Sequence, residues 1–222
     1  QNTRTWPAAT SEGQNANCQY QISNEALSQT NDMYFMIMTA AENAAFVTTT
    51  ASDSSGNKID RQFNNTLVVI RGGESSIHYR CDMRIRGNSS RDHTMGGQPA
   101  PPMRFGIPSD DSLDGSNKFN LNPRNAHLQY FGMRCFQAAG LRAPDAIPVE
   151  LRRNGVEQSS TSSTTGNFGM WVRMEDVGGE LVNNHWPLAD TGGAYKKGRS
   201  DWYWRSTQPA PNSPDSALDG FL

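Results

Sequence analysis

An alternation of polar and apolar residues in the first half of the chain constrains its fold more than any other feature. A period of two is the repeat of a β-strand with one buried face. The alternating segment is Ser76 to Arg86. A second strand-like run, Thr66 to Arg71, precedes it, with Gly72-Gly73-Glu74 between the two. The two runs predict a β-hairpin with one buried face. From Ser76 to Arg86, the apolar positions are Ile77, Tyr79, Cys81, Met83 and Ile85.

The remaining patterns predict a loop-rich α+β fold with an antiparallel sheet. Residues 125–139 have the apolar spacing of one amphipathic helix, and Gly140 supplies its stop signal. Asn154-Gly155 is a turn signal. Residues 1–30 are polar and aperiodic, which predicts an extended N-terminal arm before a main domain of residues 31–222. Further strands are predicted at residues 34–38, 103–107, 147–151 and 169–175.

Composition and charge exclude several classes of function. The formal net charge of −2 provides no long-range attraction for nucleic acid or anionic lipid, so we expect no nucleic-acid binding. The chain contains no run of 18 apolar residues, so we expect no membrane insertion. It begins at Gln1, which fits both a mature secreted protein and a piece of a longer protein.

The cysteines and histidines predict no metal site. The three cysteines lack the close pairing of zinc ribbons and redox dithiols. One disulfide with a spare thiol and a set of buried free cysteines remain open alternatives. No Ser-His-Asp order is evident, so hydrolase chemistry has no support. The residues in question are Cys18, Cys81, Cys135, His78, His93, His127 and His185.

The chain's main chemical motif follows the predicted hairpin. Strand alternation places Arg80, Arg84 and Arg86 on one face, directly before a polar loop. Gly87 permits an unusual turn and Asn88 tolerates left-handed geometry, so successive backbone N–H groups there can form an anion nest. The alternative is a polar turn capped by serine hydroxyls. The motif reads Arg84-Ile85-Arg86-Gly87-Asn88-Ser89-Ser90-Arg91, with Arg86 and Arg91 able to bind phosphate oxygens in bidentate fashion.

This motif resembles the RGNSS signature of the CotH kinase family, the relatives of spore-coat protein H. Further blocks follow in family order: Lys118-Phe119-Asn120-Leu121-Asn122, the helix to Gly140, Ala143-Pro144-Asp145, Asn154-Gly155, Gly169 to Glu175, and Ala194-Tyr195-Lys196-Lys197. The resemblance implies a protein-kinase-like α+β fold and a secreted, extracellular or cell-surface atypical protein Ser/Thr kinase. It also implies ATP and Mg²⁺ as cofactors, an extracellular or coat protein as substrate, and possible self-assembly.

The resemblance also implies which residues bind the nucleotide. The family's catalytic acids correspond to segments after Leu222, so residues 31–222 are expected to lack the C-terminal catalytic part. Glu175 either pairs with a lysine or carries a metal-bound water, or it is a strand-end carboxylate paired with Arg173. Lys118 and Lys196 are either phosphate ligands or solvated lysines. The nucleotide-binding residues expected are Arg86, Asn88, Ser89, Ser90, Arg91, Arg104, Lys118, Glu175 and Lys196.

One departure from the family pattern favours a rival function. Family members carry a lysine-bearing stretch where this chain has Pro99-Ala100-Pro101-Pro102-Met103-Arg104. Arg104 keeps the positive charge, but an arginine does not substitute for a lysine in a phosphate clamp without change. The rival is a non-catalytic extracellular structural or adhesion protein on a CotH-like scaffold. A weaker alternative is carbohydrate binding by the aromatic cluster Trp202-Tyr203-Trp204.

Overall fold

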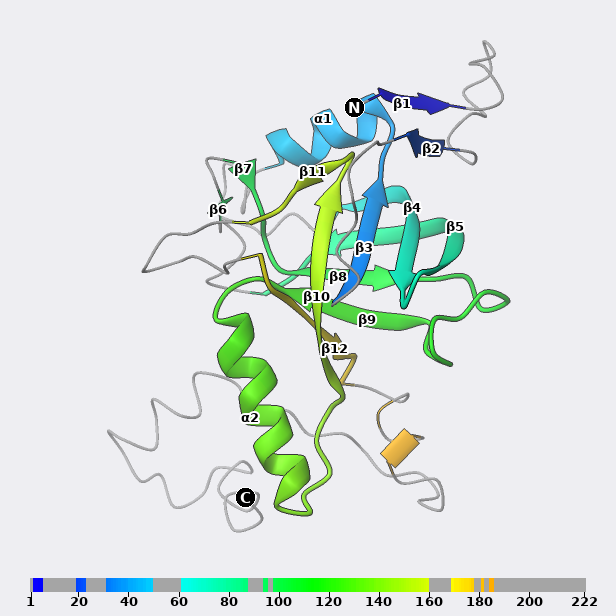
Figure 1. Ribbon diagram of the computed structural model, residues 1–222. Coiled ribbons are helices and arrows are strands. Elements are labelled where there is room, and N and C mark those ends of the chain that lie inside the picture. The colour runs from blue at the N-terminus through cyan, green and yellow to red at the C-terminus, as the bar shows by residue number, and fades with distance from the viewer. Residues whose placement is uncertain are drawn as a thin grey trace, which may run out of the picture. The chain divides into compact units, whose positions relative to one another are not determined.

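The computed structural model divides the chain into two compact units, residues 1–176 and 177–222. The sheet and the site described below belong to the first unit (Figure 1). The described residues are 2–5, 19–22, 31–49, 61–87, 94–95, 98–159, 169–177, 181 and 184–185, with the backbone alone for 2–5, 19–22, 94–95 and 98–99.

Short strands and two helices make up the described part of the first unit. β1 and β2 form a two-stranded antiparallel ribbon within the predicted N-terminal arm, where little regular structure was expected. β6 and β7 form a second ribbon. The elements are β1 (Asn2–Thr5), β2 (Gln19–Ile22), β3 (Asp32–Ile37), α1 (Ala40–Thr48), β4 (Gln62–Arg71), β5 (Glu74–Ile85), β6 (Thr94–Met95), β7 (Gln98–Pro99), β8 (Met103–Gly106), β9 (Lys118–Asn122), α2 (Ala126–Ala138), β10 (Ala146–Arg153), β11 (Val156–Glu157) and β12 (Trp171–Glu175).

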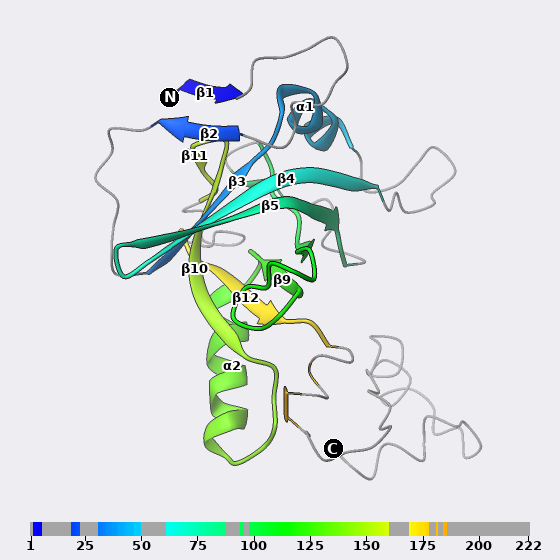
Figure 2. The same ribbon diagram turned by 90° about the vertical axis from the view of Figure 1, so that its right-hand side faces the viewer.

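Seven of these strands close into a barrel. The sheet runs in the order β11-β10-β12-β9-β8-β5-β4-β3, and β10 pairs with β3 as well as with β12. That closing pair is parallel and joins Val149–Arg153 to Asp32–Met36, whereas its neighbours in the sheet are antiparallel. Figures 1 and 2 show the strands wrapped around one interior.

The predicted kinase-like α+β fold with one main helix is therefore wrong. The sheet has no kinase-like open arrangement, because its two ends meet at the β3–β10 pair. The described helices are two, and strands dominate. Strand alternation is a local pattern and does not encode which distant strand completes a sheet. Neither described helix is long and apolar enough to cross a membrane.

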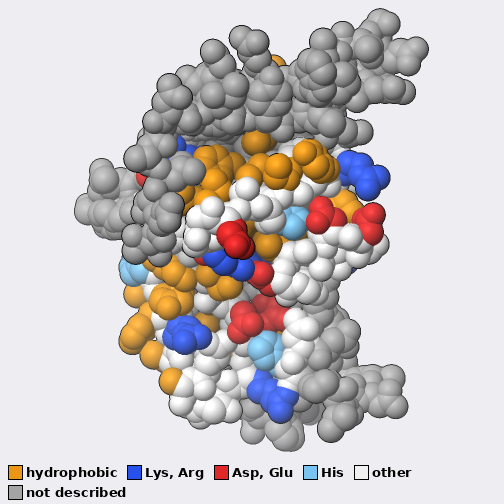
Figure 3. Space-filling view, turned by 45° about the vertical axis from the view of Figure 1, so that its right-hand side comes forward, with side chains coloured by type: hydrophobic (Ala, Val, Ile, Leu, Met, Phe, Trp, Pro, Cys, Tyr) orange, Lys and Arg blue, Asp and Glu red, His pale blue; other side chains and the backbone are white. Residues whose placement is uncertain are grey.

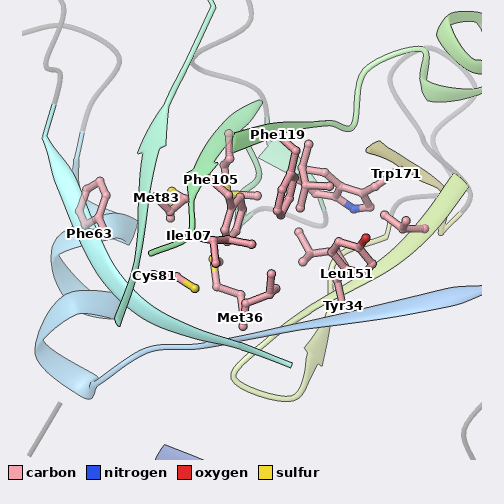
Figure 4. Close-up of a cluster of buried hydrophobic side chains, with 14 of the residues drawn as sticks. Tyr34, Met36, Phe63, Cys81, Met83, Phe105, Ile107, Phe119, Leu151 and Trp171 are labelled. Atoms are coloured by element: carbon pink, nitrogen blue, oxygen red, sulfur yellow. The ribbon is translucent and has the colours of Figure 1, made fainter. Parts of the chain in front are cut away.

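The barrel interior is the main hydrophobic core. Phe119 stacks on Phe105 with ring centroids 5.2 Å apart, and Tyr34 meets Phe119 edge-on at 6.0 Å. Trp171 is fully buried, and its Nε1 donates to the carbonyl of Gln158 at 2.7 Å. Figure 4 shows these side chains converging from strands that are far apart in the sequence. Alternate residues point inward along the strands, as the period of two requires, except across a bulge in the β4–β5 pair.

Helix α1 lies at one end of the barrel and was not predicted from the sequence. Thr39 caps it by accepting a hydrogen bond from the Glu42 N–H at 3.0 Å. Phe46 is the buried anchor, with its ring 5.5 Å from that of Phe63. The guanidinium of Arg153 lies 4.9 Å from the centroid of Phe46. One buried aromatic residue in an alanine-rich segment gives little helical periodicity, so the pattern was missed.

The loop between β8 and β9 joins the other end of the barrel through ion pairs. Asp114 binds Arg71 at 2.8 Å and also binds the buried Arg173. Arg71 in turn binds Asp32 at 2.7 Å, and Arg173 donates to the Tyr34 hydroxyl at 3.2 Å. Hydrogen bonds from Arg71, with help from Arg173, hold the pKa of Asp114 well below its usual range. The network links the loop to β3, β4 and β12.

A β-bulge breaks the predicted alternation along β5. Asn65 pairs with Cys81 and Leu67 with His78, so Thr66 faces two residues rather than one. One of them, Arg80, has a left-handed φ of 55° and is exposed. Alternation therefore holds only from Cys81 onward. The predicted burial of Ile77 and Tyr79 was wrong, since their exposed fractions are 47% and 42%.

Helix α2 packs on the outside of the barrel and confirms the helix predicted at residues 125–139. Its buried face starts with Ala126, which contacts Ala146 of β10 and Val172 of β12. Tyr130 and Met133 extend this contact. The predicted strands at 34–38, 103–107, 147–151 and 169–175 are also found as β3, β8, β10 and β12, within a few residues.

Candidate anion-binding site

A cavity of about 530 Å³ lies beside Arg86 and Gly87 of the predicted phosphate motif. It forms where the residues after β5, the residue before β8 and the first turn of α2 meet. The Arg86 N–H donates to the Pro102 carbonyl at 2.8 Å, which fixes the start of the loop against β8. Gly87 follows with a φ of 90°, a conformation that favours glycine. The lining residues are Arg86, Gly87, Pro102, Asn122, Arg124, Asn125, Leu128 and Gln129.

The first turn of α2 contributes backbone polarity to this cavity. Its N-cap, Asn125, has a left-handed φ of 52° and makes no side-chain hydrogen bond to the helix. The helix has no acidic residue in its first turn. The first N–H groups of a helix lack intrahelical partners and carry the positive end of the helix dipole. This end of α2 therefore favours a negatively charged group, and no carboxylate side chain of the helix occupies it.

Two arginines flank the helix start. Arg86 is partly buried, and burial lowers the pKa of its guanidinium while Asp176 opposes that shift. Its positive neighbours Arg104 and Arg84 lower that pKa further. Arg124 is exposed and lines the same cavity. Partly desolvated positive charge is stabilised by an anion that brings its own negative charge.

A hydrogen-bond network holds the junction between β9 and α2 in place. The Asn122 amide donates to the Gln129 side-chain oxygen at 2.9 Å, and Gln129 Nε2 donates to the Arg124 carbonyl at 2.6 Å. Asn122 Nδ2 also lies 3.4 Å from the sulfur of Met174 on β12. These contacts hold the start of α2, which lines the cavity, against the barrel.

The carboxylate of Asp176, near the cavity, forms an ion pair with Arg104. Arg104 Nη2 binds Asp176 Oδ2 at 2.5 Å, and Asn120 Nδ2 donates to Asp176 Oδ1 at 3.2 Å. None of the described residues that line the cavity is Asp or Glu. This described lining therefore presents donors and positive charge, with no carboxylate to hold a divalent cation.

The structure brings together only part of the predicted set. Arg86 lines the cavity, whereas Arg104 lies on the neighbouring strand in its ion pair with Asp176. Lys118 is exposed at the start of β9, opposite Gly106 and at the far end of that strand from Asn122. Asn88, Ser89, Ser90, Arg91 and Lys196 lie outside the described residues.

Glu175 occupies the inner face of β12 rather than the cavity. It is buried, and its Oε2 accepts a hydrogen bond from the Asp145 N–H at 3.3 Å. The Glu175 N–H donates back to the Asp145 carbonyl at 2.9 Å. The suggested partner Arg173 instead binds Asp114 and Tyr34. Glu175 therefore joins the end of β12 to the segment before β10.

Sequence reasoning missed Arg124, Asn125 and Gln129 as site residues. A signal was present: Pro123-Arg124-Asn125 places a positive residue just before a helix, where acidic residues are usual. Its proximity to Arg86 depends on the register of β9 beside β8, with Leu121 opposite Met103. That register is a tertiary property, which the local pattern does not contain.

The structure also contains a Ser-His-Asp arrangement that the sequence analysis had not found. Ser76 Oγ lies 3.1 Å from His78 Nε2, and His78 Nδ1 lies 3.0 Å from Asp111 Oδ1. His78 is only 4% exposed and connects β5 to the loop before β9. None of these three residues lines the cavity described above. Their geometry anchors the loop, and Asp111 was missed because the fold brings it to His78 from 33 positions away.

Two of the three cysteines bear on the choice between one disulfide with a spare thiol and a set of buried free cysteines. Cys81 is a buried free thiol in the barrel interior, and burial raises its pKa to about 12. Cys135 is a free thiol exposed on α2. No pair forms between these two, and the side chain of Cys18 lies outside the described residues.

No protein-family model matches the chain, and no curated protein has a significantly similar sequence. The resemblance to the CotH kinase family therefore rests on the ordered motifs alone.

Proposed function

We propose that this chain binds the phosphate groups of ATP in the cavity beside Arg86, as the nucleotide-binding part of a secreted protein Ser/Thr phosphotransferase. The single observation that carries the proposal is the convergence of Arg86, Arg124 and the start of α2 on one cavity. Two guanidinium groups and the positive end of a helix form a donor set suited to phosphate oxygens. The CotH-like motif contributes Arg86 and Gly87 to this cavity, and the family resemblance implies ATP as the phosphate donor.

The fit differs between the two cofactors that the resemblance implies. Phosphate groups fit the donors of the cavity. Mg²⁺ does not fit the described part of the lining, because magnesium is held by carboxylates and none of those residues carries one. The nearby Asp176 is engaged by Arg104 and Asn120. We therefore assign phosphate binding to these residues and derive no catalytic step from them.

Calorimetry with the full chain and a set of nucleotides tests the proposal. ATP and tripolyphosphate, each in the presence of EDTA, are expected to bind, whereas adenosine is not. Replacing Arg86 by Ala removes a charge-assisted contact, which is expected to weaken ATP binding about tenfold to a hundredfold. Arg124→Ala is expected to act in the same direction, with a smaller effect because Arg124 is exposed.

The matched control is Arg80→Ala, on β5, the strand that precedes Arg86. Arg80 is exposed, faces Asp110 at 3.9 Å and does not line the cavity. Its replacement is expected to leave ATP affinity unchanged. Equal affinity of the wild-type and Arg86→Ala proteins, or equal weakening by Arg80→Ala, would contradict the proposal.

A second candidate is the non-catalytic extracellular structural or adhesion protein. It is favoured by one observation: the arginine in the position of the family's lysine stretch, Arg104, is engaged by Asp176 and does not line the cavity. Incubation with ATP labelled on the γ-phosphate, Mg²⁺ and a generic acceptor such as casein tests the non-catalytic alternative in one direction. Labelled protein excludes it, whereas the absence of label fits both candidates, because the resemblance places the catalytic acids after Leu222.

A further inference from the structure

The solvent-facing side of α2 is apolar. Three large side chains on it are well exposed: Leu128 at 59%, Phe131 at 66% and Phe136 at 50%. Leu141, just after the helix, is 56% exposed. The spacing of three between Leu128 and Phe131 and of five between Phe131 and Phe136 places these side chains around the outer half of the helix. We call Leu128, Phe131, Phe136 and Leu141 the α2 outer patch.

The opposite side of α2 already packs on the barrel. Ala126 contacts Ala146 and Val172, and Tyr130 and Met133 pack beside them. The helix therefore has apolar residues on both its barrel-facing and its solvent-facing sides. A helix with apolar residues on two opposite faces can pack against one layer with each face. A large exposed apolar patch often marks an interaction site.

The middle of the patch permits close approach. Gly132 lies between Leu128 and Phe136 in the sequence, and a Cβ built on it meets no atom within 4 Å. Cys135 is exposed on the same helix. A partner side chain can therefore descend to the helix backbone between the larger residues, as knobs enter holes where small residues face a helix.

The charge around the patch defines its partner. From Arg124 to Asp145 the sequence contains three arginines, Arg124, Arg134 and Arg142, and the histidine His127. Its one carboxylate, Asp145, accepts a hydrogen bond from Gln137 Nε2 at 3.0 Å. Hydrophobic side chains gather beside basic ones at the lower left of Figure 3, on the side where Figure 2 places α2. A basic rim favours carboxylates on the partner and repels a second copy of the same face.

We propose that the α2 outer patch binds another protein, through an apolar segment flanked by Asp and Glu side chains. The apolar residues of the partner cover Leu128, Phe131 and Phe136, and its carboxylates face Arg124 and Arg134. A second copy of this chain brings the same basic rim and is disfavoured. The proposal does not rest on ATP binding, since only Leu128 belongs to both the patch and the cavity.

Fluorescence anisotropy with designed peptides tests the proposal on the full chain. The first peptide is an amphipathic helix with a Leu/Phe face flanked by glutamates, and the second is the same sequence with lysines in their place. The acidic peptide is expected to bind at least about tenfold more tightly, with affinity falling as salt is raised. The triple variant Leu128→Gln, Phe131→Gln, Phe136→Gln is expected to lose this binding.

The control replaces exposed apolar residues on a different element of the fold. Ile77 and Tyr79 are exposed on β5, so the double variant Ile77→Gln, Tyr79→Gln is expected to bind the acidic peptide as the wild type does. Circular dichroism confirms that both variants fold. Equal binding of the two peptides, or none of either, overturns the proposal.

Two further measurements cover the other possible occupants. Sedimentation of the protein with phosphatidylcholine/phosphatidylserine vesicles tests a membrane surface. Analytical ultracentrifugation of the protein alone tests a second copy. Vesicle binding or dimerisation that the triple variant abolishes, without binding of the acidic peptide, assigns the patch to those occupants and overturns the proposal.

Discussion

Replacing Asp114 by Asn tests the ion-pair network at the end of the barrel. Asp114 has a left-handed φ of 54°, and asparagine tolerates that conformation, so the substitution changes charge with little change in backbone strain. Wild-type Asp114 holds Arg71 and Arg173, and the side chain of Arg173 is only 9% exposed. The variant therefore leaves a buried guanidinium without its carboxylate.

The expected cost follows from the burial of each partner. Breaking a fully buried ion pair costs about 3–5 kcal/mol. The Asp114 side chain is 38% exposed, so solvent screens part of its charge and the cost is reduced. The Arg173 guanidinium also keeps its hydrogen bond to Tyr34, and Arg71 keeps Asp32. We expect the free energy of unfolding to fall by about 2 kcal/mol.

Urea denaturation of both proteins over a range of pH measures this cost and its sign. The pKa of Asp114 in the folded protein is depressed, so its contribution is fully present above the unfolded carboxyl pKa of about 3.9. The contribution declines as the pH falls from that value toward the folded pKa. The difference between wild type and Asp114→Asn is therefore expected at pH 7 and shrinks on acidification from about pH 4.

The control for this experiment is Asp110→Asn. Asp110 is 75% exposed and lies 3.9 Å from Arg80, so its replacement is expected to cost less than about 0.5 kcal/mol. A cost at Asp114 no larger than at Asp110 refutes the role of the network. A difference that stays constant down to pH 2 refutes its electrostatic origin.

Three further predictions concern the barrel. Asn154 Oδ1 accepts from the Met38 N–H at 2.7 Å, so Asn154→Gly, which keeps the left-handed turn, is expected to cost about 1–2 kcal/mol in urea unfolding; no change contradicts the role of that bond. At pH 8, peptide-resolved maleimide labelling is expected to modify Cys135 rapidly and Cys81 only on unfolding, because burial raises the pKa of Cys81 to about 12. Trp171→Phe removes the indole donor from a buried carbonyl and is expected to cost about 1–3 kcal/mol, and a smaller change would mean that water replaces the bond.

Local elements of the fold were predictable because their patterns are local. The strand at residues 34–38 and the helix at residues 125–139 follow from apolar runs and a glycine stop. Asn154-Gly155 forms the expected turn, with left-handed φ values of 47° and 81°. The apolar spacing that predicted this helix nevertheless includes Leu128, Phe131 and Phe136, whose side chains are exposed.

Features that depend on distant residues were not predictable. The bulge opposite Thr66 exchanges the faces of Ile77 and His78, and one extra residue is invisible to a period of two. The parallel pairing of β3 with β10 has no turn signal, because the two strands are not neighbours in the sequence. The kinase-like fold was inferred from motifs, which describe short segments and not sheet closure.

Of the two arginines in the candidate site, the sequence predicted one. Arg86 was named because a strand ends there in a glycine-containing loop, and this arginine does line the cavity. Arg124 was not named, because nothing local relates the start of a helix to a loop 37 positions earlier. Charge near a helix N-terminus is the signal that a second reading of the sequence would use.

The closing β3–β10 pair has a consequence for synthesis of the chain. β3 ends at Ile37, but its parallel partner ends at Arg153, so more than half of the chain leaves the ribosome before the barrel can close. Until then the edge of β3 carries unpaired backbone groups and apolar residues on both sides. Pairing of strands this distant also slows folding, because loop closure precedes the contacts that stabilise it. β3 therefore depends on β10, which is made much later, for protection from aggregation.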